Sequence, residues 1–343
     1  LAIRGGSNGG TLIGAVINQK PNLTHAFAMS SREVETCECM IELFSEDPME
    51  SSEIFHRSLA GDTFNVLVAA GRLGTSTGYI TLLGDDPFQT YLKACFVKEK
   101  IDTSQVRTIP GFNAAHFVAT KPDGDREFIY YRSNSAPTHL TPDDIDENYL
   151  LSAKILHCSG IAQAISESSR KTVLEAAKKA HKNKIIVSYD PNYRHQLWDF
   201  ETAIEAMKEL MPFVDIFMPS IPADSQALFG HDDTDQIIKQ TTDMGVETII
   251  VTKGHTGSSL YSRGEKINLD PYQTQKVVDT TGAGDAFNGA FLHGIMNGMS
   301  NYEAACLANV SAGLNITGRG ALGGMAEGAV IYNLHEKYME QMA

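Results

Sequence analysis

From residue 34 onward, short apolar runs alternate with longer segments whose apolar residues recur at the three- and four-residue spacing of a helix. Strand-like runs lie at 35–44, 78–83, 155–158, 185–189, 216–218 and 248–251, and helical patterns at 63–72, 87–100, 168–181, 202–211 and 235–244. Such runs are typical of parallel strands that are buried on both faces. The alternation therefore predicts an α/β fold with a doubly wound, mostly parallel sheet, whose ligands bind beyond the carboxyl ends of the strands.

The stretch from 106 to 132 interrupts this alternation. It contains strand-like pieces at 106–109, 116–120 and 126–132, and the turn residues Pro122-Asp123-Gly124 join the last two. Because these pieces are separated by turns rather than by helices, they predict a small antiparallel sheet set apart from the main one.

The composition limits the classes of partner. The 343 residues include 28 basic and 42 acidic side chains, which gives a net charge of −14 without any run of Lys and Arg. This balance argues against a nucleic-acid partner. No apolar stretch approaches the roughly 18 residues that span a bilayer, and the first residues lack the layout of a secretion signal, so we expect no membrane partner and a cytoplasmic location. The five cysteines are scattered, which indicates neither a disulfide framework nor a zinc site.

A short string near the C-terminus carries the clearest chemistry. Residues 279–287 read Asp-Thr-Thr-Gly-Ala-Gly-Asp-Ala-Phe and lead into a helical pattern that continues to residue 297. The amides of Gly282, Ala283 and Gly284 would then lie at a helix N-terminus, where unpaired N–H groups and the helix dipole favour an anion. Asp285 beside that anion could accept a proton from an attacking hydroxyl, so the string predicts phosphoryl transfer. Taken alone, it also fits a glycine-rich turn followed by an ordinary acidic residue.

The same string resembles the C-terminal signature of the ribokinase-like (PfkB) carbohydrate kinases. In those kinases the last Asp is the catalytic base and the Gly-Ala-Gly amides form the anion hole, so the resemblance assigns these roles to Asp285 and to Gly282, Ala283 and Gly284. The resemblance covers about residues 34–338 and implies a ribokinase-like fold in which segments near 42–60 and 106–133 form a small β lid. Because the lid often serves as a dimer surface in this family, we expect a homo-oligomer that assembles through it.

A second segment resembles the N-terminal sugar-binding motif of the family. Ala60-Gly61-Asp62-Thr63-Phe64-Asn65 precedes a helix, and the resemblance assigns Gly61, Asp62 and Asn65 to the substrate. On its own the segment also fits an ordinary helix N-cap.

The strand 126–132 and the segment 190–198 indicate which sugar is bound. Alternate residues of a strand share a face, so Tyr130 and Arg132 are expected to point together. With Asn192 and Arg194 they resemble the 2-keto-3-deoxygluconate kinase branch of the family, in which these positions meet an acidic sugar. An arginine fork suits a carboxylate, although either arginine alone also fits an ordinary surface ion pair.

The nucleotide residues are expected after the strand that ends at residue 251. Thr252-Lys253-Gly254 and Gly257 resemble the ATP phosphate loop of the family, and Asn309 matches a position beside adenine. From the residues alone, the loop could also be a tight turn.

One departure from the family concerns the metal. Many members carry Asn-x-x-Glu after the strand that corresponds to 216–218, where it organises Mg²⁺, but residues 219–224 here read Pro-Ser-Ile-Pro-Ala-Asp. Ser220 and Asp224 are candidate substitutes, and we assign Ser220 to the nucleotide site. The resemblance implies ATP and Mg²⁺ as cofactors, with the metal ligands unassigned and a monovalent cation left open.

Residues 1–27 contain a different resemblance. Ser7 lies in a G-x-S-x-G pattern similar to the nucleophile elbow of the prolyl oligopeptidase family. However, no strands precede this pattern, and the downstream chain follows the kinase pattern instead of supplying the Asp and His of a triad. We therefore interpret residues 1–33 as an extension before a kinase domain at 34–338.

Taken together, these patterns predict a kinase that transfers the γ-phosphoryl group of ATP to a primary hydroxyl of 2-keto-3-deoxygluconate and so forms its 6-phosphate. A fructokinase or another neutral-sugar kinase of the same fold is the main alternative. Two alternatives from other classes are a serine hydrolase that acts through Ser7 and a sugar-binding module without catalysis.

Overall fold

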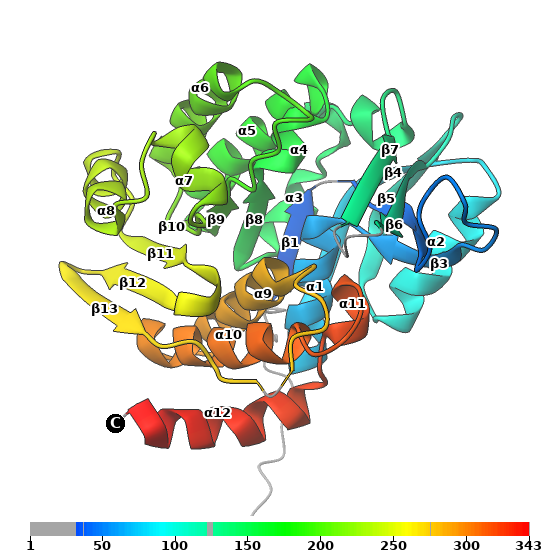
Figure 1. Ribbon diagram of the computed structural model, residues 1–343. Coiled ribbons are helices and arrows are strands. Elements are labelled where there is room, and N and C mark those ends of the chain that lie inside the picture. The colour runs from blue at the N-terminus through cyan, green and yellow to red at the C-terminus, as the bar shows by residue number, and fades with distance from the viewer. Residues whose placement is uncertain (1–31, 37, 122–125, 275, 343) are drawn as a thin grey trace, which may run out of the picture.

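A nine-stranded sheet forms the centre of the computed structural model, which describes residues 32–36, 38–121, 126–274 and 276–342 (Figure 1). The strand order is β13-β12-β11-β10-β9-β8-β1-β4-β5. The bounds are β1 (Arg32–Thr36), β4 (Ser76–Gly84), β5 (Asp102–Ile109), β8 (Ile155–Ser159), β9 (Ile186–Asp190), β10 (Ile216–Phe217), β11 (Thr248–Thr252), β12 (Ser258–Ser262) and β13 (Glu265–Leu269). The pairs from β5 to β11 are parallel, whereas β11, β12 and β13 pair antiparallel. The predicted mostly parallel α/β sheet is confirmed, and the antiparallel hairpin at one edge was not predicted.

Helices cover both faces of this sheet (Figure 1). One face carries α3 (Glu147–Leu151), α4 (Gly160–Ala164), α5 (Glu167–Lys182), α6 (Phe200–Leu210), α7 (Ala223–Leu228) and α8 (Thr234–Asp243). The other carries α1 (Asp62–Leu73), α2 (Phe88–Lys98), α9 (Ala283–Met296) and α10 (Asn301–Asn315), with α12 (Gly328–Met342) packed outside α10. Fully buried side chains such as Val173 on the first face and Phe291 on the second fill the layers between. The apolar cores on the two faces of the sheet hold the strand ends in place. The predicted ligands are expected at the carboxyl ends of these strands.

Short turns of helix complete the described chain. They are η1 (Ala136–His139), η2 (Pro142–Asp144), η3 (Met211–Phe213), η4 (Gly254–Thr256) and α11 (Ala321–Gly324). Both η4 and α11 lie in loops that border the predicted site.

A smaller four-stranded sheet lies beside one end of the main sheet (Figure 1). Its order is β3-β2-β6-β7, with β2 (Met40–Ser45), β3 (His56–Ala60), β6 (Ala114–Thr120) and β7 (Arg126–Tyr131). The pairs β2–β3 and β6–β7 are antiparallel, but β2 and β6 run parallel. We call this sheet the lid. The expected second sheet is present, but the expectation of a purely antiparallel sheet was wrong.

Two strand predictions near the lid need correction. The piece expected at 106–109 belongs to β5, which pairs parallel with β4 at the edge of the main sheet. Because β5 is an edge strand, it is only partly buried and contains both polar and apolar residues. This sequence pattern is similar to that of a strand in a small sheet with one solvent-exposed face. The run 35–44 is not one strand either, because β1 ends at Thr36 in the main sheet and β2 begins at Met40 in the lid.

A close contact between α1 and α9 sets the geometry of the predicted site. A Cβ at Gly289 would lie 2.4 Å from the Val66 carbonyl oxygen, so only glycine allows the two helices to approach this closely. The N-termini of both helices therefore lie side by side at the carboxyl end of the sheet. The predicted helix after the Gly-Ala-Gly string is confirmed, and Ala283 is its first residue.

The central strand β1 carries two buried acids in a position where an α/β sheet normally has apolar residues. Glu33 and Glu35 are fully buried. Burial raises the pKa of Glu33 to about 8 and that of Glu35 well above its ordinary value. Repulsion from Glu33, Asp62 and Asp285 adds to the rise at Glu35, which places that side chain near the predicted base.

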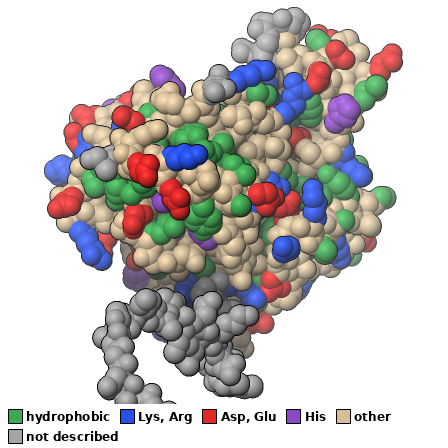
Figure 2. Space-filling model, turned by 90° about the horizontal axis from the view of Figure 1, so that it is seen from below, with side chains coloured by type: hydrophobic (Ala, Val, Ile, Leu, Met, Phe, Trp, Pro, Cys, Tyr) green, Lys and Arg blue, Asp and Glu red, His purple; other side chains and the backbone are tan. Residues whose placement is uncertain are grey.

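The predicted elbow at Ser7 and most of the predicted extension lie outside the described residues, and the expected boundary at 33 falls within β1. None of the described helices is long and apolar enough to cross a membrane. Acidic, basic and apolar side chains are interspersed over the described part of the face in Figure 2.

Candidate active site

Two helix N-termini meet at the carboxyl end of the central strands. Asn65, in the first turn of α1, donates a hydrogen bond of 2.7 Å from Nδ2 to Oδ2 of Asp285, in the first turn of α9. The close packing of α1 on α9 brings these residues together although 220 positions separate them in the sequence. The predicted base and the Asn of the predicted sugar motif are therefore neighbours.

The environment of Asp285 changes its acidity. Burial raises the pKa of its carboxyl to about 7, and the negative charge of Asp62 contributes to the rise. The hydrogen bond from Asn65 and the positive charge of Arg194 act in the opposite direction. Because a general base works best when its pKa is near the working pH, Asp285 has the acidity that proton abstraction requires.

Asp62 connects the sugar motif to the segment after β9. Its Oδ2 accepts a hydrogen bond of 3.0 Å from Nδ2 of Asn192 and another from the hydroxyl of Ser159. Asn192 has a left-handed backbone, with φ of 36°. Its backbone N–H donates a hydrogen bond of 2.9 Å to Oδ1 of Asp190. The predicted substrate residues of the two segments thus lie in one place, with Gly61 directly before Asp62. Ser159 was not predicted, although its position at the end of a buried strand is a usable signal.

The predicted arginines have different surroundings. Arg132 forms an ion pair with Glu38, and its guanidinium carbon lies 5.5 Å from the centre of the Tyr130 ring. Glu38 is fully buried, and its Oε2 has no hydrogen-bond partner among the described residues. Arg194 is exposed. Burial raises the pKa of both Tyr130 and Asp285, and the charge of Arg194 opposes each rise, so Arg194 lies within electrostatic reach of both.

The predicted phosphate loop follows β11. Thr252 pairs with Ser220 in an isolated β-bridge, and the Lys253 N–H donates to the Gly257 carbonyl at 2.8 Å, which closes the turn through Gly254. The Lys253 ammonium donates to Oγ of Ser259 at 2.9 Å. The predicted loop and Ser220 are therefore adjacent, although they come from the ends of two strands.

A cavity of about 660 Å³ opens beside this loop. Its lining residues are His255, Thr256, Asp270, Pro271, Tyr272, Gln273, Tyr338 and Gln341. Asn309 does not line it: this side chain is buried and donates hydrogen bonds of 3.4 Å to Ser258 and to the Tyr338 hydroxyl. Tyr338 comes from α12, whose contribution no motif predicted.

The acidic side chains suit a cation that arrives with phosphates. Burial and the charges of Asp224, Asp285 and Asp62 raise the pKa of Asp190, so these carboxylates repel one another. Asp224 already accepts hydrogen bonds from the N–H and hydroxyl of Ser220, at 2.7 and 2.6 Å, and from the Tyr193 N–H at 2.7 Å. The described residues contain no cluster of three or more His, Cys, Asp or Glu side chains that could hold a metal by themselves. Mg²⁺ fits such a site, because it is usually bound by one or two carboxylates together with phosphates.

The chain is similar to known sugar kinases. The model of the pfkB family of carbohydrate kinases matches residues 36–327. A 5-dehydro-2-deoxygluconokinase of Clostridium perfringens is 30% identical over 274 residues, which are 78% of this chain and 80% of that protein. The 2-dehydro-3-deoxygluconokinase of Dickeya dadantii is 30% identical over 301 residues, 83% of this chain and 94% of that protein. Fructokinase-1 of Zea mays is 31% identical over 293 residues, 82% and 90% of the two chains.

Solved structures have the same fold. An E. coli protein assigned as ribokinase II, solved with ATP and Mg²⁺, superimposes with a TM-score of 0.82 at 26% identity, over 91% of this chain and 99% of that protein.

Proposed function

Because this chain belongs to the pfkB family of carbohydrate kinases, we propose that it transfers the γ-phosphoryl group of ATP to the primary hydroxyl of 2-keto-3-deoxygluconate and forms the 6-phosphate. The observation that carries the proposal is the position of Asp285, at the N-terminus of α9 beside the sugar motif and within reach of an exposed arginine. The 2-dehydro-3-deoxygluconokinase of Dickeya dadantii, whose name denotes the same substrate, supports the choice of sugar.

In the proposed reaction, Asp285 accepts the proton of the sugar hydroxyl while the hydroxyl oxygen attacks the γ-phosphorus. The bond between the γ-phosphorus and the β,γ-bridging oxygen breaks, and ADP leaves. The amides of Gly282, Ala283 and Gly284 stabilise the charge of the transferring group from a helix N-terminus. Without a ligand, the Ala283 N–H donates a hydrogen bond of 3.3 Å to the Thr280 carbonyl. Mg²⁺, bound with the nucleotide near Asp190 and Asp224, would neutralise phosphate charge.

The remaining polar groups orient the sugar. Asn65 keeps Asp285 in position, and Asp62 with Asn192 supplies a hydrogen-bonding edge for sugar hydroxyls. Arg194 and Arg132 bind the carboxylate of the substrate. Tyr130, in strand β7 of the lid, contacts the substrate beside them. Such fixed donors and acceptors lower the barrier by holding the reacting atoms together.

The nucleotide binds on the other side of the anion-binding amides. The proposed phosphate contacts come from Ser220, Thr252, Lys253 and the loop through Gly254 and Gly257. The cavity of about 660 Å³ beside this loop, with the Tyr272 and Tyr338 rings in its wall, has room for the adenosine part. Asn309 supports this wall through its hydrogen bond to Tyr338.

One observation favours a neutral sugar as the second candidate. Arg132 is already paired with the buried Glu38, so its charge is compensated before any substrate binds. A paired arginine and glutamate could bind sugar hydroxyls, as a fructokinase would need, and the similar Zea mays protein is named as a fructokinase. In that case only Arg194 would remain for a carboxylate.

Replacing Asp285 by Asn tests the reaction itself. The variant keeps the side-chain shape but cannot accept the proton, so we expect kcat for ADP release with 2-keto-3-deoxygluconate to fall by about 10²–10⁴. ATP affinity, measured by calorimetry, should stay unchanged, and Asp243→Asn at the exposed end of α8 is the matched control.

Near-normal turnover in Asp285→Asn would contradict the role of this carboxylate. Sugar binding by the wild-type protein without ADP release would favour a binding module, and labelling of Ser7 by a fluorophosphonate probe would favour a hydrolase.

Replacing Arg194 by Met tests the substrate class. A charged hydrogen bond contributes about 1.5–3 kcal/mol, so we expect KM for 2-keto-3-deoxygluconate to rise by roughly 10–100-fold, with fructose kinetics unchanged. Arg263→Met, in the turn between β12 and β13, is the control. A wild-type enzyme that prefers fructose or ribose, with no selective effect of Arg194→Met, would instead identify a neutral-sugar kinase.

Assembly through the lid is part of the same proposal. Ile129 and Tyr131, on the face of β7 that Phe117 also lines, are 39% and 59% exposed. We expect a dimer in sedimentation velocity at micromolar concentration, and Tyr131→Asp should shift it to monomer because it places a charge in the apolar contact. Phe200→Asp, an exposed aromatic residue at the start of α6, should leave the dimer intact. A wild-type monomer would contradict this assembly.

A further inference from the structure

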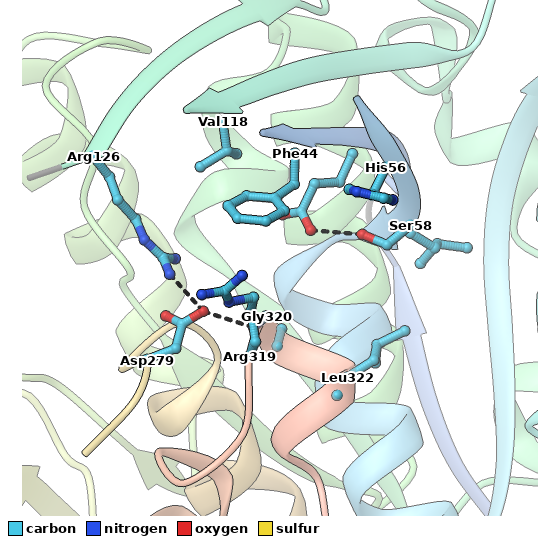
Figure 3. Close-up of a pocket in the computed structure, with 13 residues that line it drawn as sticks. Phe44, His56, Ser58, Val118, Arg126, Asp279, Arg319, Gly320 and Leu322 are labelled. Carbon is cyan, nitrogen blue, oxygen red and sulfur yellow. Dashed lines mark hydrogen bonds and ion pairs between the residues drawn. The ribbon is translucent and has the colours of Figure 1, made fainter. Parts of the chain in front are cut away.

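A pocket of about 220 Å³ lies where the lid meets the loops that precede α9 and α11 (Figure 3). Arg126, the first residue of β7, extends from the lid toward Asp279 in this pocket (Figure 3). Its Nη2 lies 2.8 Å from Oδ2 of Asp279, and its Nη1 donates a hydrogen bond of 2.8 Å to the hydroxyl of Thr281. Because two nitrogens of one planar group are used, the contact fixes direction as well as distance.

The Asp279 carboxylate joins two loops. Its side chain is only 3% exposed, and it accepts hydrogen bonds from the Thr281 N–H at 2.9 Å and the Gly320 N–H at 2.6 Å. Burial would raise the pKa of this carboxyl, but the hydrogen bonds from Arg126 and from these two amides leave its pKa below the ordinary value. Asp279 is therefore charged at neutral pH and holds both loops to the lid.

These loops determine where the anion-binding amides lie. Gly282 has a left-handed backbone, with φ of 79°, and a Cβ there would lie 2.6 Å from Cβ of Ala321. The turn thus rests directly on the first residue of α11, next to the amide of Gly320 that Asp279 holds. A shift of either loop would move the amides of residues 282–284.

A second contact between the lid and these loops is weaker. Arg319 pairs with Glu46, just after β2, and lies over the Phe44 ring at 5.2 Å. Both charged side chains are more than half exposed, and such ion pairs contribute little. The contact from Arg126 to the buried Asp279 is therefore the stronger connection of the two.

The same strand reaches the proposed substrate carboxylate. Arg126 is the first residue of β7, and Arg132 directly follows its last residue, roughly 20 Å away along an extended chain. One end of β7 contacts the loop before α9, and the other carries the residues assigned to the sugar.

We propose that Arg126 is a positioning residue, and that phosphoryl transfer depends on the contact that Arg126 makes between the lid and the loop before α9. When substrate binding brings the lid over the cleft, Arg126 forms its ion pair with Asp279 and its hydrogen bond with Thr281. These contacts place the amides of 282–284 where they can bind the transferring group. This inference rests on the proposed kinase reaction for its catalytic part, whereas the link between lid and loop stands independently of it.

The test compares Arg126→Met with Arg57→Met, which removes an arginine of the lid that stacks on Tyr91 and does not touch the loop. We expect Arg126→Met to lower kcat by up to roughly 10²-fold, because small displacements of reacting groups have effects of that size. ATP affinity should be unchanged. In hydrogen exchange, peptides that cover 279–284 and 318–322 should exchange faster in Arg126→Met and as in the wild type in Arg57→Met.

Arg126→Lys keeps the charge but not the fork, so it should recover only part of kcat, and it replaces Arg126→Met if that variant does not fold. Unchanged kcat in a variant with faster exchange, or unchanged exchange in both peptides, would overturn the proposal. If the wild-type protein phosphorylates no sugar, the proposed function fails, while the exchange measurement still decides whether Arg126 holds the loop.

Discussion

The carboxylate of Asp285 lies at the N-terminus of α9, where it meets the side-chain amide of Asn65 and the negative charge of Asp62. A helix N-terminus and a hydrogen-bond donor stabilise the charged carboxylate, whereas burial and a neighbouring acid destabilise it. The outcome is a pKa of about 7 for the Asp285 carboxyl. Near neutral pH a part of the molecules therefore carry the ionised carboxylate, which can accept a proton. The catalytic role proposed for this site depends on that balance.

The fold supplies the conditions for this balance. Only glycine at 289 lets α9 approach α1 closely enough for the Asn65 amide to reach Asp285. The layers of helices on both faces of the sheet hold these helix starts in place, although the central strand contains the buried acids Glu33 and Glu35. Sites that break local rules in this way are stable only because the surrounding structure fixes them.

The architecture and the helix that begins in the Gly-Ala-Gly-Asp string could be predicted from the sequence, because both depend on local pattern. Alternating apolar runs and helical periods give the parallel sheet, and the Gly-Ala-Gly-Asp string marks the start of a helix through its own residues. The strand-like piece at 106–109 was assigned to the wrong sheet, since an edge strand of a parallel sheet such as β5 and a strand of a small sheet have similar mixed patterns.

Contacts between distant side chains could not be predicted in the same way. Arg132 pairs with Glu38 across 94 positions, and Arg126 reaches Thr281 across 155. No periodicity connects such residues, because their meeting depends on how the lid sits against the loops before α9 and α11. The cavity wall that Tyr338 forms has the same origin, since it requires α12 to pack outside α10.

The most direct measurement is the titration of the Asp285 carboxyl in the free protein, followed by NMR of ¹³C-labelled aspartate and assigned by the signal that Asp285→Asn removes. A midpoint near pH 7 is expected. It should move to higher pH in Asn65→Leu, because that variant loses a hydrogen bond to the charged form. A midpoint near the ordinary aspartate value of about 3.9, unaffected by Asn65→Leu, would contradict the assignment of Asp285 as the base.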